Sequence, residues 1–135
     1  PGETEQEFEE TVRFLTDLDL YEIHVFPYSR RPGTVADTLP GQVKRAEKER
    51  RSAVLLALTA GQAHTYRESF LGDELHVLLE EEEEIAGIRC LTGHTERYIK
   101  AAVPISEDSD GQEAAPGDWV IGKPEGFLDD EVMLL

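Results

Sequence analysis

The side chains best suited to binding chemistry lie in one short run, HVFPYSRRPGT, between His24 and Thr34. An alternating apolar stretch ends there at Pro27, and a tyrosine, a serine and two arginines follow at once. Guanidinium forks bind carboxylates and phosphates, and hydroxyl groups hydrogen-bond to nucleosides. Sheets of α/β proteins hold their ligands at the carboxyl ends of the strands. The run therefore predicts a ligand-binding loop, and the alternative is a solvated turn whose arginines pair with acids.

A second set of candidate residues lies in GHTERYIK, residues 93–100, and suits contact with RNA. Cations, an imidazole and an aromatic ring are close together there, as in proteins that stack and clamp single-stranded nucleic acid. The residues are His94, Thr95, Arg97, Tyr98 and Lys100. In the alternative interpretation, Tyr98 packs in a core and the cations pair with surrounding acids.

The only basic cluster in the chain begins a predicted helix near the middle, and Lys44 and Lys48 belong to it. Their ammonium groups can meet RNA phosphates. They can also pair with glutamates one turn away, an interaction worth only about 0.2–0.5 kcal/mol. The sequence leaves these two interpretations equally open.

The charge of the chain argues against a generic nucleic-acid-binding protein. It has 29 acidic and 13 basic residues, for a formal net charge of −16. Residues 72–135 hold 17 of the acids and four of the bases, whereas sequence-independent affinity for phosphates comes from lysine and arginine. An alternative class is a non-catalytic acidic module that binds a basic protein, because complementary potentials steer partners together.

The chain has few residues that could form a metal site or a disulfide. Cys90 is the single cysteine, which excludes an internal disulfide and a metal or iron–sulfur site made of cysteines alone. The glutamates of 80–84 suit a solvated hairpin or a strand extension better than a magnesium site, since consecutive carboxylates do not converge. We therefore predict no metal site in this chain.

Apolar spacing indicates the elements that position the first half of these candidates. Helical periodicity over 5–18, opened by the capping box of Thr4 and Glu7, predicts a helix. Residues 21–26 predict a strand that ends at the proline. An ordered loop or a single turn is expected between two Pro-Gly pairs, and a long helix is expected over 42–70.

Residues 72–135 predict β structure. Five short alternating segments fit a small, closed, antiparallel barrel of the OB-like kind, and the polar loop at 106–117 is expected to be mobile. The fold class is therefore α+β. We find no candidate membrane span or signal peptide, so a soluble, intracellular protein is expected. The chain opens on a helix cap without an initiator Met, which suggests a piece of a longer protein.

Four motifs in a fixed order resemble one known family. PGETEQEFEET, HVFPYSRRPGT, YRESFLG and GHTERYIKAAV together are similar to the C-terminal portion of a radical S-adenosylmethionine methylthiotransferase with a TRAM domain. These enzymes add a methylthio group to an adenosine beside the tRNA anticodon. HVFPYSRRPGT most resembles the branch that acts on threonylcarbamoyl-adenosine, rather than the isopentenyl-adenosine branch. The alternative of an acidic module that binds a basic protein would correspond to the branch that acts on a ribosomal protein.

The resemblance implies a division into domains. Residues 1–40 would be the last αβ unit of a partial TIM-like radical barrel, residues 41–71 a connector helix, and residues 72–135 the TRAM barrel that helps to hold tRNA. The adenosylmethionine cofactor would lie beside three residues of the first loop: Tyr28, Ser29 and Arg31. The parent would be a cytoplasmic tRNA-processing enzyme.

The resemblance does not extend to the cluster that starts the chemistry. The Cys-x-x-x-Cys-x-x-Cys motif that binds the catalytic [4Fe–4S] cluster is missing. The parent would use S-adenosylmethionine and iron–sulfur clusters. This portion alone should bind neither tightly and should be inactive, with no catalytic residue of its own. The strand at 21–26, without its barrel neighbours, is expected to pair with a second copy of the chain.

Overall fold

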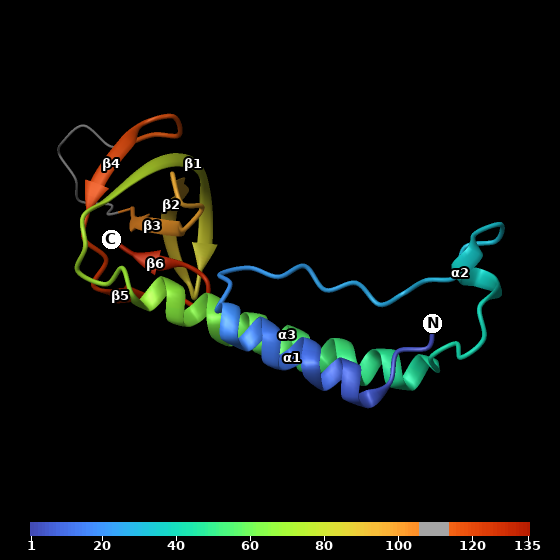
Figure 1. Cartoon of the computed structure of the whole chain (residues 1–135). Coiled ribbons are helices and arrows are strands. Elements are labelled where there is room, and N and C mark those ends of the chain that lie inside the picture. Colours follow the sequence, from blue (N-terminus) through green and yellow to red (C-terminus); the bar gives the residue numbers. More distant parts are fainter. Residues whose placement is uncertain (106–113) are drawn as a thin grey trace. The chain divides into compact units, whose positions relative to one another are not determined.

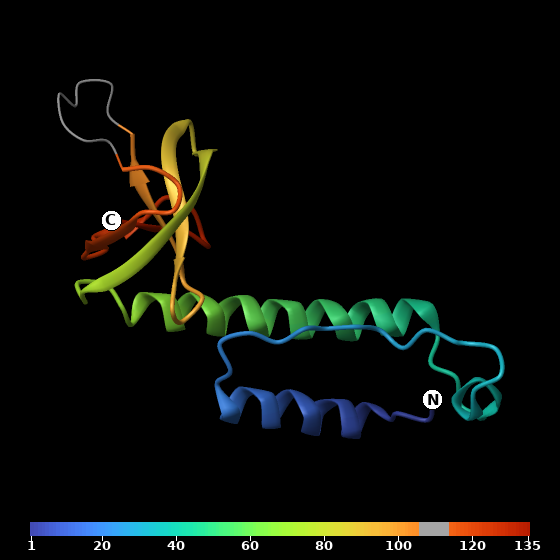
Figure 2. The same ribbon diagram turned by 90° about the horizontal axis from the view of Figure 1, so that it is seen from above.

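The computed structural model describes residues 1–105 and 114–135, so most of the loop expected to be mobile, 106–117, lies outside the described residues. The described chain divides into two compact units, Pro1–Ala63 and His64–Leu135. The first unit is built of helices and extended connections and the second is built around a β-sheet (Figures 1 and 2). The predicted α+β class is confirmed.

Helix α1 (Glu5–Leu18) begins at the predicted capping box. The Thr4 hydroxyl oxygen accepts a hydrogen bond from the Glu7 N–H at 3.3 Å, and the Glu7 carboxylate accepts one from the Thr4 N–H at 2.7 Å. These bonds satisfy donors that have no partner inside the helix. The C-cap, Asp19, takes a left-handed conformation with a φ of +48°, which ends the helix.

Two further helices match the predictions. Helix α2 (Val35–Thr38) is a single turn between the Pro-Gly pairs, one of the two structures expected there. The long helix is α3 (Arg45–Glu68), of 24 residues, and Gly61 lies inside it without interrupting it. From His64 onward, α3 belongs to the second unit.

Helices α1 and α3 run parallel within the first unit. The Arg51 guanidinium, near the start of α3, donates to the Glu3 carboxylate just before α1. Further along both helices, Gln62 Nε2 donates to the Leu15 carbonyl at 3.0 Å. The start of α1 therefore lies beside the start of α3, and the two helices point the same way. Phe8 is the buried residue on α1.

Residues 21–26 do not form the strand that their alternating pattern predicts. They run as an extended segment along α3 (Figure 2), where the Ile23 N–H donates to Thr59 Oγ1 at 3.1 Å. A strand forms only through a ladder of hydrogen bonds with a neighbour, and no strand of the described chain pairs with this segment. The expected αβ unit therefore lacks its strand. The self-association predicted from an unpaired strand edge has no support.

The second unit contains one six-stranded sheet in the order β4-β1-β2-β3-β6-β5. The two long strands, β1 (Leu75–Ile85) and β2 (Ile88–Thr95), form an antiparallel hairpin. Strand β3 (Lys100–Pro104) pairs with β2, and β4 (Trp119–Gly122) pairs with β1, both antiparallel.

The closed, five-stranded, antiparallel barrel predicted from the sequence is wrong. Strands β5 (Gly126–Phe127) and β6 (Met133–Leu134) have two residues each, and β6 pairs in parallel with β3. The sheet therefore has six strands, is mixed, and is not closed. Pattern alone indicates that strands exist, but closure requires a full ladder between the first and last strands.

The core of this unit lies on one face of β1, where Leu75, Val77 and Leu79 are buried. The register shifts between Leu79 and Glu81, so one extra residue bulges out of β1. The glutamates at 80–84 continue the same strand as its exposed end. The run both extends the strand and forms one arm of the β1–β2 hairpin, so it combines the two structures considered for it.

Candidate functional site

One face of the sheet carries a row of side chains that crosses four strands. Trp119 on β4 lies opposite Leu78 on β1, and Leu78 lies opposite His94 on β2. His94 in turn lies opposite Lys100 on β3. Opposed residues on antiparallel strands share a face, with Cβ atoms about 4.5–5.5 Å apart. We call these four residues the outer row, because none of them is buried and Trp119 is 62% exposed.

Tyr98 extends the outer row at the turn between β2 and β3. Its backbone has a φ of +63°, a left-handed conformation that bulky residues seldom adopt. The side chain is 77% exposed, and its ring lies 5.5 Å from the His94 ring, centroid to centroid. An aromatic ring held outward in this way presents a flat face to solvent, as a base-stacking platform requires.

Two other predicted RNA-binding residues have different surroundings. Thr95 is buried, and its hydroxyl oxygen accepts hydrogen bonds from the Arg97 and Ile99 N–H groups, both at 3.2 Å. It therefore shapes the turn that presents Tyr98. Arg97 is exposed, with its guanidinium carbon 5.2 Å from the centre of the Phe70 ring, which leaves its N–H groups able to meet a ligand.

The Lys100 ammonium and the His94 imidazole of the outer row already have acidic partners. Lys100 Nζ lies 2.5 Å from a Glu83 carboxylate oxygen, and His94 Nδ1 lies 2.8 Å from Glu80. Hydrogen bonds from Lys100, and then from Thr92, hold the pKa of Glu83 below its ordinary value. The pairing expected in the alternative interpretation is therefore present for Lys100, whereas Tyr98 is exposed rather than packed in a core.

The sequence interpretation missed the β4 side of this face. Trp119 and Ile121 alternate with the half-buried Val120, and Ile121 lies opposite His76 on β1. Trp119 is 62% exposed and Ile121 is 60% exposed, and such exposure is unusual for large apolar side chains that lie side by side on one face. The signal was available in DWVIG, where a tryptophan and an isoleucine share the parity of strand residues that face away from the core.

The loop residues predicted to bind the cofactor lie in the first unit. Tyr28 is half-buried, and its hydroxyl oxygen is buried with no hydrogen-bond partner among the described residues. Ser29 and Arg31 are exposed, and the Arg31 carbonyl accepts hydrogen bonds from the N–H and hydroxyl groups of Thr34. Arg30 instead donates to the Asp37 carboxylate at 2.7 Å. Among the residues that the structure describes, the Tyr28 hydroxyl has no hydrogen-bond partner and the Arg31 guanidinium has no ion pair, so both are available to a ligand.

Lys48 joins this loop, whereas Lys44 stays at the surface. Lys48 Nζ donates to the Tyr28 carbonyl at 2.8 Å and lies 5.9 Å from the centre of the Tyr28 ring. Tyr28 and Lys48 line a cavity of about 300 Å³ within the first unit. Its other lining residues include the apolar side chains of Phe8, Val25 and Leu55. Lys44 is exposed and its ammonium group has no ion pair within the described ranges.

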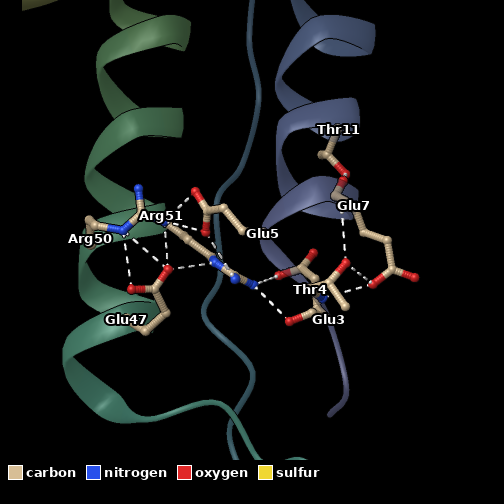
Figure 3. A network of polar contacts seen from close by, with 8 residues as sticks. All are labelled: Glu3, Thr4, Glu5, Glu7, Thr11, Glu47, Arg50 and Arg51. Atoms are coloured by element: carbon tan, nitrogen blue, oxygen red, sulfur yellow. Dashed lines mark hydrogen bonds and ion pairs between the residues drawn. The ribbon is translucent and has the colours of Figure 1, made fainter.

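Arg50 and Arg51, near the start of α3, form ion pairs with glutamates of the same unit. Figure 3 shows Arg51 bonded to Glu3, Glu5 and Glu47, and Arg50 bonded to Glu5 and Glu47. Hydrogen bonds from Arg50, together with those from Arg51, overcome desolvation and lower the pKa of Glu47 to about 2. These two arginines fasten α1 to α3, so only part of the basic cluster is free for a ligand.

The described residues do not fit an iron–sulfur cluster. The chain has a single cysteine, Cys90, which is buried, and burial raises the pKa of its thiol. In residues 1–105 and 114–135, no three His, Cys, Asp or Glu side chains converge as metal ligands would. Over the same residues, no helix combines the length and apolar character needed to cross a membrane.

Comparison with known proteins finds relatives that act on tRNA. The chain is 36% identical over 113 residues to the threonylcarbamoyladenosine tRNA methylthiotransferase of Bacillus subtilis. The aligned region covers 83% of the chain and 25% of that protein. It is 38% identical over 96 residues to the tRNA-2-methylthio-N(6)-dimethylallyladenosine synthase of Actinobacillus succinogenes, covering 71% of the chain and 20% of that protein. No protein-family model matches the chain.

The chain thus spans a quarter or less of the length of these two relatives. Two enzymes with different nucleoside substrates match it at similar identity, so the likeness indicates the common class rather than one branch. The chain is partly homologous to the tRNA methylthiotransferases.

Proposed function

We propose that this chain is the tRNA-binding portion of a methylthiotransferase that acts in the cytoplasm on an adenosine beside the anticodon. The observation that carries the proposal is the likeness to two tRNA methylthiotransferases over most of the chain. The exposed aromatic and cationic side chains of the outer row and Tyr98 support it. In domain terms, residues 1–40 would derive from the catalytic barrel, 41–71 would connect, and 72–135 would be the TRAM domain.

The outer row would hold unstacked bases of the anticodon loop. Tyr98 and Trp119 offer exposed aromatic faces, and base–aromatic stacking is worth about 1–3 kcal/mol per base whatever the base. Arg97 and Lys100 would meet phosphates at the edge of the stack, with Lys100 exchanging Glu83 for a phosphate oxygen. Thr95 would act indirectly, by holding the turn that presents Tyr98.

The chemistry of methylthiolation would come from S-adenosylmethionine and [4Fe–4S] clusters in the parent enzyme. Because one buried cysteine cannot hold such a cluster, no reaction step is assigned to this chain. Its contribution on that side would be the loop residues Tyr28, Ser29 and Arg31, which would form part of the wall around the adenosylmethionine. The nucleoside would be threonylcarbamoyl-adenosine, because HVFPYSRRPGT most resembles the branch that acts on it, whereas the overall likeness indicates only the common class.

The test is binding of the whole chain to a tRNA anticodon stem-loop, measured by fluorescence anisotropy. Trp119→Ala and Tyr98→Ala should each raise the Kd about tenfold, the lower part of the range for one lost stacking partner. Phe14→Ala is the matched control, because Phe14 is an exposed aromatic residue of α1. Equal Kd values for the two platform variants and the control would contradict the proposal.

A second candidate function rests on charge. Residues 72–135 have 17 acidic and four basic residues, which suits a basic protein partner, such as the substrate of a ribosomal-protein methylthiotransferase. A cationic, lysine-rich peptide that binds the chain more tightly than the stem-loop, and that loses affinity on Trp119→Ala, would favour this candidate over the first.

A further inference from the structure

Positive charge is concentrated in one short part of the chain. Residues 28–48 contain five basic and two acidic residues, whereas the rest of the chain contains eight basic and 27 acidic residues. A polyanion approaching a molecule with a net charge of −16 is repelled almost everywhere else. The main electrostatic attraction should therefore come from this segment.

Three of these five cations, Arg30, Arg45 and Lys48, line one hollow. An open groove of about 480 Å³ in the first unit is lined by two stretches about twenty residues apart in sequence. One stretch is the loop Pro27–Arg30, and the other is the start of α3 with Arg45, Lys48 and Glu49. Lys44 directly precedes α3 beside Arg45. We call Arg30, Lys44, Arg45 and Lys48, with this hollow, the cationic groove.

The cations of the groove exceed their acidic partners. Arg30 pairs with Asp37 and Arg45 pairs with Glu49, each at 2.7 Å. Lys48 donates to a backbone carbonyl, which carries no formal charge, and Lys44 has no ion pair among the described residues. Each ammonium has three donors and each guanidinium has five, so most of these N–H groups remain available.

We propose that the cationic groove binds the phosphodiester backbone of RNA. This inference rests on the proposed function and adds to it a second, electrostatic binding surface. In the second unit, Lys100 and His94 are already matched by Glu83 and Glu80, so the outer row supplies stacking but little net charge. The groove supplies most of the phosphate contacts, in addition to those of Arg97 and Lys100, and with them most of the dependence of binding on salt.

The test is the salt dependence of stem-loop binding by the whole chain, compared for two variants of equal charge. K44Q/R45Q removes two groove cations whose side chains are exposed. R13Q/K123Q removes two exposed cations elsewhere and is the matched control. At about 50 mM salt, K44Q/R45Q should weaken binding at least tenfold, and the slope of log K against log salt should fall by about 1.4, or 0.7 per lost phosphate contact.

A third variant makes the opposite prediction. E49Q removes the carboxylate that competes for Arg45, so it should tighten binding and steepen the salt slope. Unfolding midpoints of all variants should match that of the parent chain, because exposed ion pairs contribute about 0–1 kcal/mol. A K44Q/R45Q variant with altered far-UV circular dichroism would leave E49Q to decide.

The outcomes separate this inference from the proposed function. Weaker binding by K44Q/R45Q but not by R13Q/K123Q, with tighter binding by E49Q, supports the groove. Equal affinities and equal slopes for the two double variants would overturn the groove while the outer row still stands. No measurable binding of the stem-loop by the parent chain would overturn both.

Discussion

Gly93 marks the closest backbone approach in the sheet. A β-carbon added at this position would overlap the Leu78 carbonyl group and the backbone of Leu79 across the β1–β2 pair. The position lies beside the bulge in β1, one residue before His94 of the outer row. The steric limit on Gly93 therefore fixes the register that brings His94 opposite Leu78.

Gly93→Ala should destabilise the second unit by about 1–3 kcal/mol or more, as overpacking a tight site does. Urea denaturation followed by the fluorescence of Trp119, the single tryptophan, measures the change. Gly126→Ala is the control, because a β-carbon there would meet no atom within 4 Å. Similar midpoints for both variants would show that the sheet can yield at Gly93.

Residue types indicate which side chains could bind a ligand, but they do not indicate which of those side chains are accessible. His94, Tyr98 and Lys100 lie close together, because a short turn joins β2 to β3 and places His94 opposite Lys100. Thr95 lies inside, since strand residues alternate between faces and its neighbour His94 points outward. Trp119 joins the row only through the pairing of β4 with β1, a long-range register that no local pattern encodes.

Among the elements, the carboxylate of Glu47 holds Arg50 and Arg51, the two arginines of α3 that bond to the α1 side, and that network should respond to pH. The folded chain lowers the pKa of Glu47 from 4.5 to about 2. A depressed pKa contributes stability that is fully present above the unfolded value and is lost as pH falls toward the folded value. The contribution of Glu47 should therefore be complete above pH 4.5 and fade between pH 4.5 and about 2.

Between these limits, the parent chain should lose more helix stability than Glu47→Gln, which has no carboxylate to protonate. Urea midpoints from circular dichroism at 222 nm, taken at several pH values, provide the measurement. Glu9→Gln is the control, because Glu9 is exposed on α1 and has no ion pair in the described part of the chain. If the urea midpoint of Glu47→Gln changed with pH as much as that of the parent chain, Glu47 would not be the source of the pH dependence.

Helices were predictable from the sequence, and sheet closure was not. The signals for α1 lie within the helix itself: a period of 3.6 residues and a capping box. The alternation at 21–26 is equally clear, yet a strand needs a partner, and the described chain offers none. The two-residue strands β5 and β6 are too short to carry a pattern at all.

For the whole molecule, the contrast between the two units lies in their charge. Residues 1–63 contain 11 acidic and eight basic residues, whereas residues 64–135 contain 18 acidic and five basic residues. The first unit gains from attraction in its Arg50 and Arg51 network. In the second unit, the large excess of negative charge makes repulsion among carboxylates the dominant electrostatic interaction.

Salt should therefore act on the two units in opposite directions. The Debye length falls from about 10 Å at 0.1 M to about 3 Å at 1 M salt, which screens attraction and repulsion alike. Raising sodium chloride over this range should raise the urea midpoint seen by Trp119 fluorescence, because repulsion in the second unit is relieved. The midpoint seen by helical circular dichroism, to which α1 and most of α3 contribute from the first unit, should stay level or fall. Two midpoints that coincide and move together would show instead that the units unfold as one, with the long helix α3 transmitting stability from the sheet to the first unit.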